Sequence, residues 1–290
     1  MDCEVLKDLI DRKLLLELTV DLEKYHNPSS LTDISCFFSL VGISGFDVPG
    51  VRAHVCALKE GIKRASEIRK DLGMKEFIEP FIKISIGPRE FLEEGPFTSL
   101  SDLEESVKEC LSEGINIIEF HPGGMDEDVL YEYFETIKSL IDDQLISLNI
   151  NRYNKSNAHL VNRSKHAFDL FGDKLMLQID GGTALDSENS YHNTIQTIAT
   201  ADILIKDLKV KERRKFKKMP ILLSGDINAK TAGLAKLCEI EYNGISVKLE
   251  SIEEHNSLVY DLNEIGKDEF TRNLNQMEKF LEAFKNLDRN

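Results

Sequence analysis

Short apolar runs recur along the chain, and longer stretches with apolar residues at helical spacing separate them. Several of the short runs are almost continuously apolar, which is typical of parallel strands that are covered by helices. The pattern predicts eight strands, at residues 14–20, 44–48, 81–86, 115–121, 145–149, 174–179, 219–224 and 243–249.

The longer stretches carry signals for helix ends. Residues 99–114 have Ser101 as the predicted N-cap and Glu104 three residues later, which is the spacing of a capping box, and the stretch stops at Gly114. Residues 126–141 begin with acids, which the helix dipole favours at that end. Further helices are predicted within residues 30–42, 51–73, 158–172, 189–205, 228–239 and 261–287.

Eight strands alternating with eight helices in 290 residues predict a single-domain α/β protein with a closed (β/α)8 barrel, the TIM-barrel fold. An open doubly wound sheet is the alternative. It is less favoured because "TVDLEKYHNP" follows the first strand, in place of the glycine-rich turn that binds dinucleotides in such sheets.

Composition and charge exclude some classes of function. Apolar residues make up 41% of the chain, enough for a sizeable core, and 51 acidic against 36 basic residues give a net charge of -15. This charge argues against a nucleic-acid or anionic-membrane surface, and no apolar run is long enough to span a bilayer. We therefore expect a soluble, cytoplasmic protein whose partner is a small-molecule ligand or another protein. The one basic run, residues 209–218, is either a solvated helix end or a docking patch for an acidic partner.

The five cysteines are scattered and form no C-x-x-C pair. That pattern is typical of reduced intracellular thiols, and we expect neither disulfides nor a metal site.

In a (β/α)8 barrel, function gathers where the strands end and in the loops that follow them. Polar residues stand at these positions, each after apolar ones, and they predict a site at one rim. They are Asp21, Asp47, Ser85, Gly87, Glu119, His121, Asn149, Asn151, Arg152, Asp180, Ser224, Asp226, Lys248 and Glu250.

The sixth strand ends in Asp180, Gly181 and Gly182. The two glycines would let a ligand approach the main chain without meeting a Cβ. The carboxylate of Asp180 could accept a hydrogen bond from a ligand hydroxyl or amine, or bind a divalent ion. A tight turn without a ligand is the alternative.

The seventh strand ends in Ser224 and Gly225, and a helix is predicted to begin near Asn228. A helix N-terminus suits an anion such as phosphate. Phosphate-binding barrels also use a glycine turn after the eighth strand, where this chain has Lys248 but also Glu250, so half of the expected cradle is missing.

Charged residues interrupt apolar strands at Glu17, Lys83 and Lys248. Because the first and eighth strands are neighbours in a closed barrel, Glu17 and Lys248 could form an interior ion pair. A catalytic lysine that acts as a Schiff-base nucleophile is the more specific alternative.

Glu119 and His121 are two residues apart and therefore share one face of the fourth strand. A histidine at the rim could transfer protons or share a metal ion with Asp180, although a His-Pro-Gly-Gly turn also has a purely structural explanation.

Five segments together resemble a known family: "SLVGISGFDVPG", "IIEFHPGG", "QIDGGT", "LLSGDINAKT" and "NGI". They are similar to the C-terminal barrel domain of the light-dependent period proteins, LdpA, and to ycf-type barrels of plastids. The resemblance implies a barrel of flavin- or phosphate-binding ancestry. That family carries iron–sulfur clusters in a cysteine-rich insert, but no cysteine cluster follows "ISIGPREFLEEGPFTSL" here, so a cluster is not expected.

Two functions remain open. The first is a barrel that binds a small, phosphorylated or flavin-type ligand at its rim. Its ligand contacts would be Asp180, Gly181, Gly182, Ser224, Gly225 and Asn228, with Glu119, His121 and Lys248 as acid–base or electrostatic groups. The second is a non-catalytic regulatory or scaffold barrel in redox or circadian-type signalling. Pairing of Glu17, Lys83 and Lys248 across the mouth would favour the second.

Overall fold

The fold was determined as a computed structural model. It describes residues 15–20, 28–71, 78–87, 99–151, 156–180, 190–211, 219–225 and 242–249, together with residues 6, 10, 227, 234, 271–275, 277, 279, 281 and 282.

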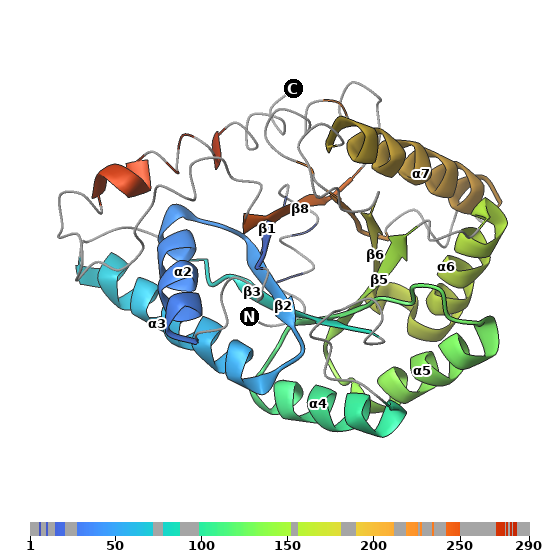
Figure 1. The fold of residues 1–290 in the computed structure, drawn as a ribbon, viewed down its shortest axis with the longest axis horizontal. Coiled ribbons are helices and arrows are strands. Elements are labelled where there is room, and N and C mark those ends of the chain that lie inside the picture. The colour runs from blue at the N-terminus through green and yellow to red at the C-terminus, as the bar shows by residue number, and fades with distance from the viewer. Residues whose placement is uncertain are drawn as a thin grey trace.

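Eight parallel strands close into a barrel in which each strand pairs with its neighbour in sequence and β1 pairs with β8 (Figure 1). The strands are β1 Leu15–Thr19, β2 Gly45–Pro49, β3 Phe81–Ile86, β4 Ile117–Phe120, β5 Leu145–Asn151, β6 Leu175–Asp180, β7 Ile221–Ser224 and β8 Gly244–Lys248. Each lies within two residues of its predicted range, and the predicted closed (β/α)8 barrel is confirmed.

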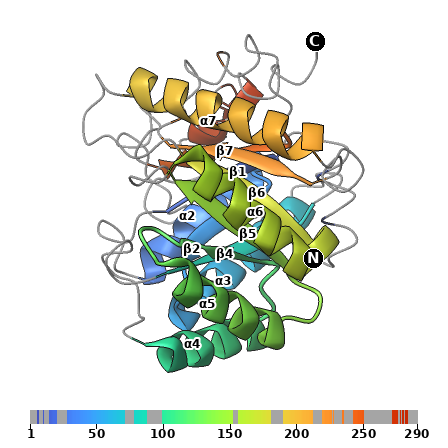
Figure 2. The same ribbon diagram turned by 90° about the vertical axis from the view of Figure 1, so that its right-hand side faces the viewer.

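Helices surround the ring of strands on its outer side in both views (Figure 1 and Figure 2). They are α2 Pro28–Val41, α3 Arg52–Asp71, α4 Leu100–Ser112, α5 Glu127–Leu140, α6 Asn157–Phe171 and α7 Ser190–Lys211, with a short 3-10 turn, η1, at Gly172–Lys174. The predicted helix at 228–239 and the C-terminal helix lie largely outside the described residues. Among the described helices, none has the length and apolarity needed to cross a membrane.

The predicted N-cap of α4 was wrong by two residues. Leu100 and Ser101 are already helical, and Ser99 is the N-cap, because its extended backbone lets its hydroxyl accept the amide proton of Asp102. A serine stands at both positions, so the sequence alone offered two equivalent starts.

The core has two parts. The larger part lies between the strands and the helices that cover them. A smaller cluster fills the barrel interior near the start of the strands, where successive inward positions are two residues apart. Its members are Leu6, Ile10, Leu15, Phe81, Ile117, Leu145, Met176 and Leu222.

The described cysteines lie on three different helices. Cys36 and Cys110 are buried in α2 and α4, Cys56 is exposed on α3, and all three are free thiols.

Candidate functional site

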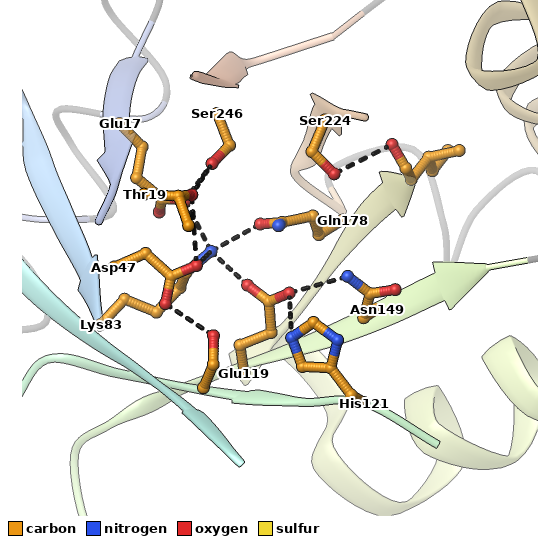
Figure 3. Close-up of polar contacts among 12 residues, drawn as sticks. Glu17, Thr19, Asp47, Lys83, Glu119, His121, Asn149, Gln178, Ser224 and Ser246 are labelled. Carbon is orange, nitrogen blue, oxygen red and sulfur yellow. Dashed lines mark hydrogen bonds and ion pairs between the residues drawn. The ribbon is translucent and has the colours of Figure 1, made fainter. Parts of the chain in front are cut away.

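Polar side chains replace apolar ones on the inward face as the strands approach their C-terminal ends, here called the mouth of the barrel. The side-chain period of two places Glu17 above Leu15, Lys83 above Phe81, and Glu119 above Ile117. Figure 3 shows these side chains converging from different strands toward the barrel axis. The layer above the apolar cluster is therefore a polar network.

Lys83 on β3 is the centre of this network. Its side chain is fully buried, and its Nζ lies 2.6 Å from Glu17 Oε1 and 3.3 Å from Asp47 Oδ2. It also forms an ion pair with Glu119 Oε2 and donates a hydrogen bond of 2.6 Å to Gln178 Oε1 (Figure 3). One ammonium group thus joins residues from β1, β2, β4 and β6.

These contacts keep Lys83 charged. Burial lowers the pKa of the Lys83 ammonium, but the carboxylates of Asp47, Glu119 and Glu17 outweigh burial and hold that pKa above its ordinary value. A Schiff-base nucleophile must lose this proton before it can attack a carbonyl. The arrangement therefore argues against Lys83 as the nucleophile that the sequence left open.

The three acids around Lys83 are not equivalent. Burial raises the pKa of Glu17 to about 7, with Lys83 opposing the rise, and burial likewise raises the pKa of Asp47. For Glu119, Lys83 and His121 overcome the effect of burial and lower its pKa to about 2. Because three acids share one lysine, Glu119 keeps its negative charge, whereas Glu17 and Asp47 hold a proton more readily than exposed acids do.

Oxygens of Glu17, Asp47 and Glu119 lie within 4.8 Å of one another, close enough for three carboxylates to surround a metal ion. The ammonium of Lys83 contacts all three acids. It therefore supplies, from within the chain, the positive charge that such a trio attracts.

The predicted ion pair between Glu17 and Lys248 was wrong. In the closed barrel Glu17 is opposite Ser246, whose hydroxyl donates a hydrogen bond of 2.7 Å to Glu17 Oε1. Lys248 is opposite Thr19, two residues nearer the mouth, and is partly exposed. Glu17 pairs with Lys83 instead. Two of the three residues whose pairing would favour a scaffold barrel are therefore paired, at a level deeper in the barrel than Lys248.

Glu119 and His121 meet at the upper edge of the network. His121 Nε2 lies 2.9 Å from Glu119 Oε1, and Asn149 Nδ2 donates a hydrogen bond of 2.8 Å to the same oxygen (Figure 3). The Glu119 side chain is fully buried, whereas 22% of the His121 side chain is exposed. The histidine is thus the member of the pair that a molecule at the mouth can reach.

Charges around His121 favour its protonated form. Burial lowers the pKa of the imidazole, but Glu119, with weaker contributions from Asp47 and Asp180, raises it above the ordinary value of histidine. The pair therefore offers a proton at the mouth, with a buried carboxylate behind it.

A second polar group lies beside this pair. Ser85 Oγ donates a hydrogen bond of 2.6 Å to Asp47 Oδ1, and both side chains are almost fully buried. The Thr19 hydroxyl lies 2.8 Å from that of Ser246, on the β1–β8 side of the mouth. Hydroxyl groups therefore border the carboxylates where the strands end.

The predicted ligand contacts have different outcomes. Asp180 ends β6 in register with Ser224 on β7, which places the two at the same level of the mouth. Gly225 follows with a φ of 87°, a conformation that glycine adopts without strain. Gly181, Gly182 and Asn228 lie outside the described residues, so their predicted contact with a ligand stays a prediction.

Sequence reasoning did not name Gln178, Thr19 or Ser246 as members of the network, and it did not place Lys83 at its centre. Lys83 was recognised as an interior charge, but its place at the centre was not, and Gln178 was seen only as part of a motif. Both interrupt apolar strands, and Gln178 shares its strand face with Asp180. The two-residue alternation of side chains along a strand was the available signal. Which side chain each of these residues contacts depends on the register between the strands.

Comparison with known proteins shows the fold. No family model matches the sequence, and no curated protein matches it significantly. A "putative deoxyribose-phosphate aldolase" from Toxoplasma gondii ME49 is similar in structure, with a TM-score of 0.55 and 16% identity over 88% of this chain and 98% of that one. Ribulose-1,5-bisphosphate carboxylase/oxygenase from Pyrococcus horikoshii OT3 has a TM-score of 0.53 and 13% identity over 97% of this chain and 66% of that one. At these identities the comparisons support the (β/α)8 barrel and no particular activity.

Proposed function

We propose that this protein is an enzyme that binds a small molecule at the mouth of the barrel and transfers a proton through His121. The observation that carries the proposal is the 2.9 Å contact between the partly exposed His121 and the fully buried Glu119. A histidine oriented by a carboxylate is a common arrangement for general acid–base catalysis.

The network below the pair supports this role. A buried carboxylate is costly unless it is neutralised and hydrogen-bonded, and Glu119 has both Lys83 and Asn149 as partners. Its lowered pKa keeps it ionised, so that it can fix the orientation of the imidazole and stabilise its charge. Lys83 thereby acts through Glu119, as an electrostatic anchor.

We infer that the ligand is a small polar molecule with a carbonyl or imine group. Protonated His121 donates its proton to that oxygen or nitrogen, while water takes the proton from the adjacent carbon to give the enol or enamine, and the reverse step restores both protons. Partly exposed polar side chains where the strands end, Thr19, Asp180 and Lys248, supply hydrogen-bonding partners for such a molecule. The phosphorylated or flavin-type ligand implied by the resemblance to LdpA proteins remains a prediction, as does the scaffold alternative.

Deuterium exchange tests the proposal across several classes of candidate substrate at once. The protein is incubated in D2O with a panel of hydroxyaldehydes, hydroxyketones and 2-keto acids, and with their phosphorylated forms where these exist. Proton NMR then follows exchange of the hydrogen on the carbon next to the carbonyl group. We expect at least one compound to exchange, and the His121→Asn variant to lose about a hundredfold or more of the rate.

The matched control is His159→Asn, because His159 is an exposed histidine at the start of α6. It should exchange the same compound at the wild-type rate. Exchange of no compound above the protein-free rate, or equal rates in the His121→Asn variant and the wild type, would overturn the proposal. Circular dichroism of each variant confirms that the fold is intact.

A further inference from the structure

The loop that carries His121 is partly buried. Residues 121–126 connect β4 to α5, and Pro122 and Gly123 are buried whereas Gly124 is exposed. Gly123 has a φ of 47°, and the amide of Met125 donates a hydrogen bond of 3.0 Å to the Pro122 carbonyl. The loop is therefore a compact turn whose remaining carbonyls need partners inside the protein.

Arg163 on α6 supplies those partners. Its side chain is only 1% exposed, and its guanidinium donates to Gly123 O at 3.1 Å and to Met125 O. Its Nε donates to Glu127 Oε1 at 3.0 Å, in the first turn of α5. Helices α5 and α6 lie side by side in both ribbon views (Figure 1 and Figure 2), so one side chain joins α6 to the loop and to the next helix.

The chemistry of arginine suits this position. A guanidinium presents five N–H donors in a rigid fork, so it can satisfy two carbonyls and a carboxylate at once. The carboxylate of Glu127 offsets the cost of burying the positive charge. Lysine would keep the charge but lose the fork.

On its other side the loop is held by β3. The amide of His121 donates a hydrogen bond of 2.8 Å to the Ile86 carbonyl. Gly87 follows so closely that a Cβ at this position would lie 2.9 Å from the His121 carbonyl oxygen. The His121 backbone is thus confined between β3 and the segment that Arg163 holds.

We propose that Arg163 is a positioning residue: by fixing residues 121–125 it holds the His121 imidazole against Glu119. The catalytic consequence rests on the proposed function, but the effect on the position of His121 does not. Nothing in the sequence around Arg163 indicates this role, because its partners lie about forty positions earlier in the chain.

The test compares Arg163→Lys with Arg64→Lys. Arg64 forms a 2.9 Å ion pair with Asp33 between α3 and α2, so its replacement controls for the loss of a guanidinium elsewhere. Nitrogen-detected NMR follows the titration of the His121 imidazole in each protein. In Arg163→Lys we expect the pKa of His121 to fall toward the ordinary histidine value, because its contact with Glu119 is loosened. Arg64→Lys should titrate as the wild type does.

The deuterium-exchange assay gives the second readout. In Arg163→Lys we expect kcat to fall roughly tenfold to a hundredfold, with KM changed less, because a small displacement of a catalytic group is costly. A folded Arg163→Lys variant with unchanged His121 titration would overturn the positioning role. A changed titration together with no exchange in the wild type would instead overturn the proposed function alone.

Glu127→Gln provides a second variant should Arg163→Lys fail to fold. It removes the charge that faces Arg163 but leaves both loop carbonyls with their donors. We expect the pKa of His121 to fall part of the way toward the ordinary histidine value, because Arg163 loses the charge that holds its guanidinium over the loop. A folded Glu127→Gln variant in which His121 titrates as in the wild type would overturn the proposal.

Discussion

Lys83 shows how a single residue organises the barrel interior. Its ammonium is shared by acids that reach it from β1, β2 and β4. The apolar run around Lys83 indicated an inward charge, and the alternation of side chains placed Glu119 and His121 on one face of their strand. Which acid would meet it could not be predicted, since that depends on how far one strand is shifted against the next.

Removal of this ammonium should destabilise the fold strongly. Lys83→Met leaves three buried carboxylates without their cation, and breaking a buried ion pair in this way costs about 3–5 kcal/mol. Urea unfolding measures the loss. The control Lys108→Met removes an exposed lysine from a pair with Glu104 within α4 and should cost far less. Equal losses in the free energy of unfolding would show that the Lys83 contacts stabilise the fold no more than an exposed ion pair does.

Lys83 should also be unreactive toward carbonyl compounds. Its raised pKa keeps the amine protonated, and its side chain is fully buried. After treatment with an aldehyde and cyanoborohydride, peptide mass spectrometry should find adducts on exposed lysines such as Lys206 and none on Lys83. Preferential labelling of Lys83 would point to Schiff-base chemistry and against an electrostatic anchor.

Secondary-structure elements were the most predictable part of the molecule. Strand positions followed from continuous apolar runs, because parallel strands in a barrel are covered on both faces. Helix ends were less certain, as the shift of the α4 N-cap from Ser101 to Ser99 shows. The packing of one helix against another is indicated less clearly in the sequence than the strands are. One indication is Gly61, in the middle of α3.

Gly61 allows α3 to approach α2 closely. A Cβ added there would lie 1.9 Å from Ser35 Oγ and 2.3 Å from the Thr32 carbonyl oxygen. We therefore expect Gly61→Ala to destabilise the protein by about 1–3 kcal/mol, although alanine favours helices over glycine.

The control for this packing effect is Ser66→Ala on the exposed side of the same helix, which should be neutral or slightly stabilising in thermal unfolding. A stabilised Gly61→Ala variant would mean that the two helices are not packed as closely as the structure has them.

Closure of the barrel is the property of the whole molecule that gives the site its charge balance. Alternation of strands and helices predicted the closure, but the pairing of β1 with β8 was needed to place Ser246, and not Lys248, beside Glu17. The interior consequently holds Glu17, Asp47 and Glu119 around one lysine. An excess of buried acid should appear in the stability of the whole protein.

Stability attributable to Glu17 should fall as the pH rises from about 4.5 to 7. The folded pKa of Glu17 is about 7 against an ordinary 4.5, so the folded state binds more protons than the unfolded state in that window. Stability therefore decreases with pH there, at up to about 1.4 kcal/mol per pH unit for one fully shifted proton. Asp47 and His121, whose pKa values are also raised, act in the same direction.

Glu119 acts in the opposite direction at lower pH, because its pKa is lowered to about 2 and its contribution is lost as the pH falls from 4.5 toward that value.

Urea unfolding of the wild type and of Glu17→Gln at pH 5, 6, 7 and 8 separates the effect of Glu17. The difference between the two proteins should change between pH 5 and pH 7 and then level off toward pH 8. A constant difference would show that Glu17 keeps an ordinary pKa in the folded protein.

The account depends most on the contact between His121 and Glu119, and an NMR titration of the His121 imidazole in the wild type and in Glu119→Gln tests it most directly. We predict that the wild-type imidazole titrates above the ordinary histidine pKa and that Glu119→Gln returns this pKa toward the ordinary value. The same ordinary pKa in both proteins would contradict the account. It would show that the Glu119 carboxylate has no effect on the His121 imidazole, the group that we propose transfers the proton.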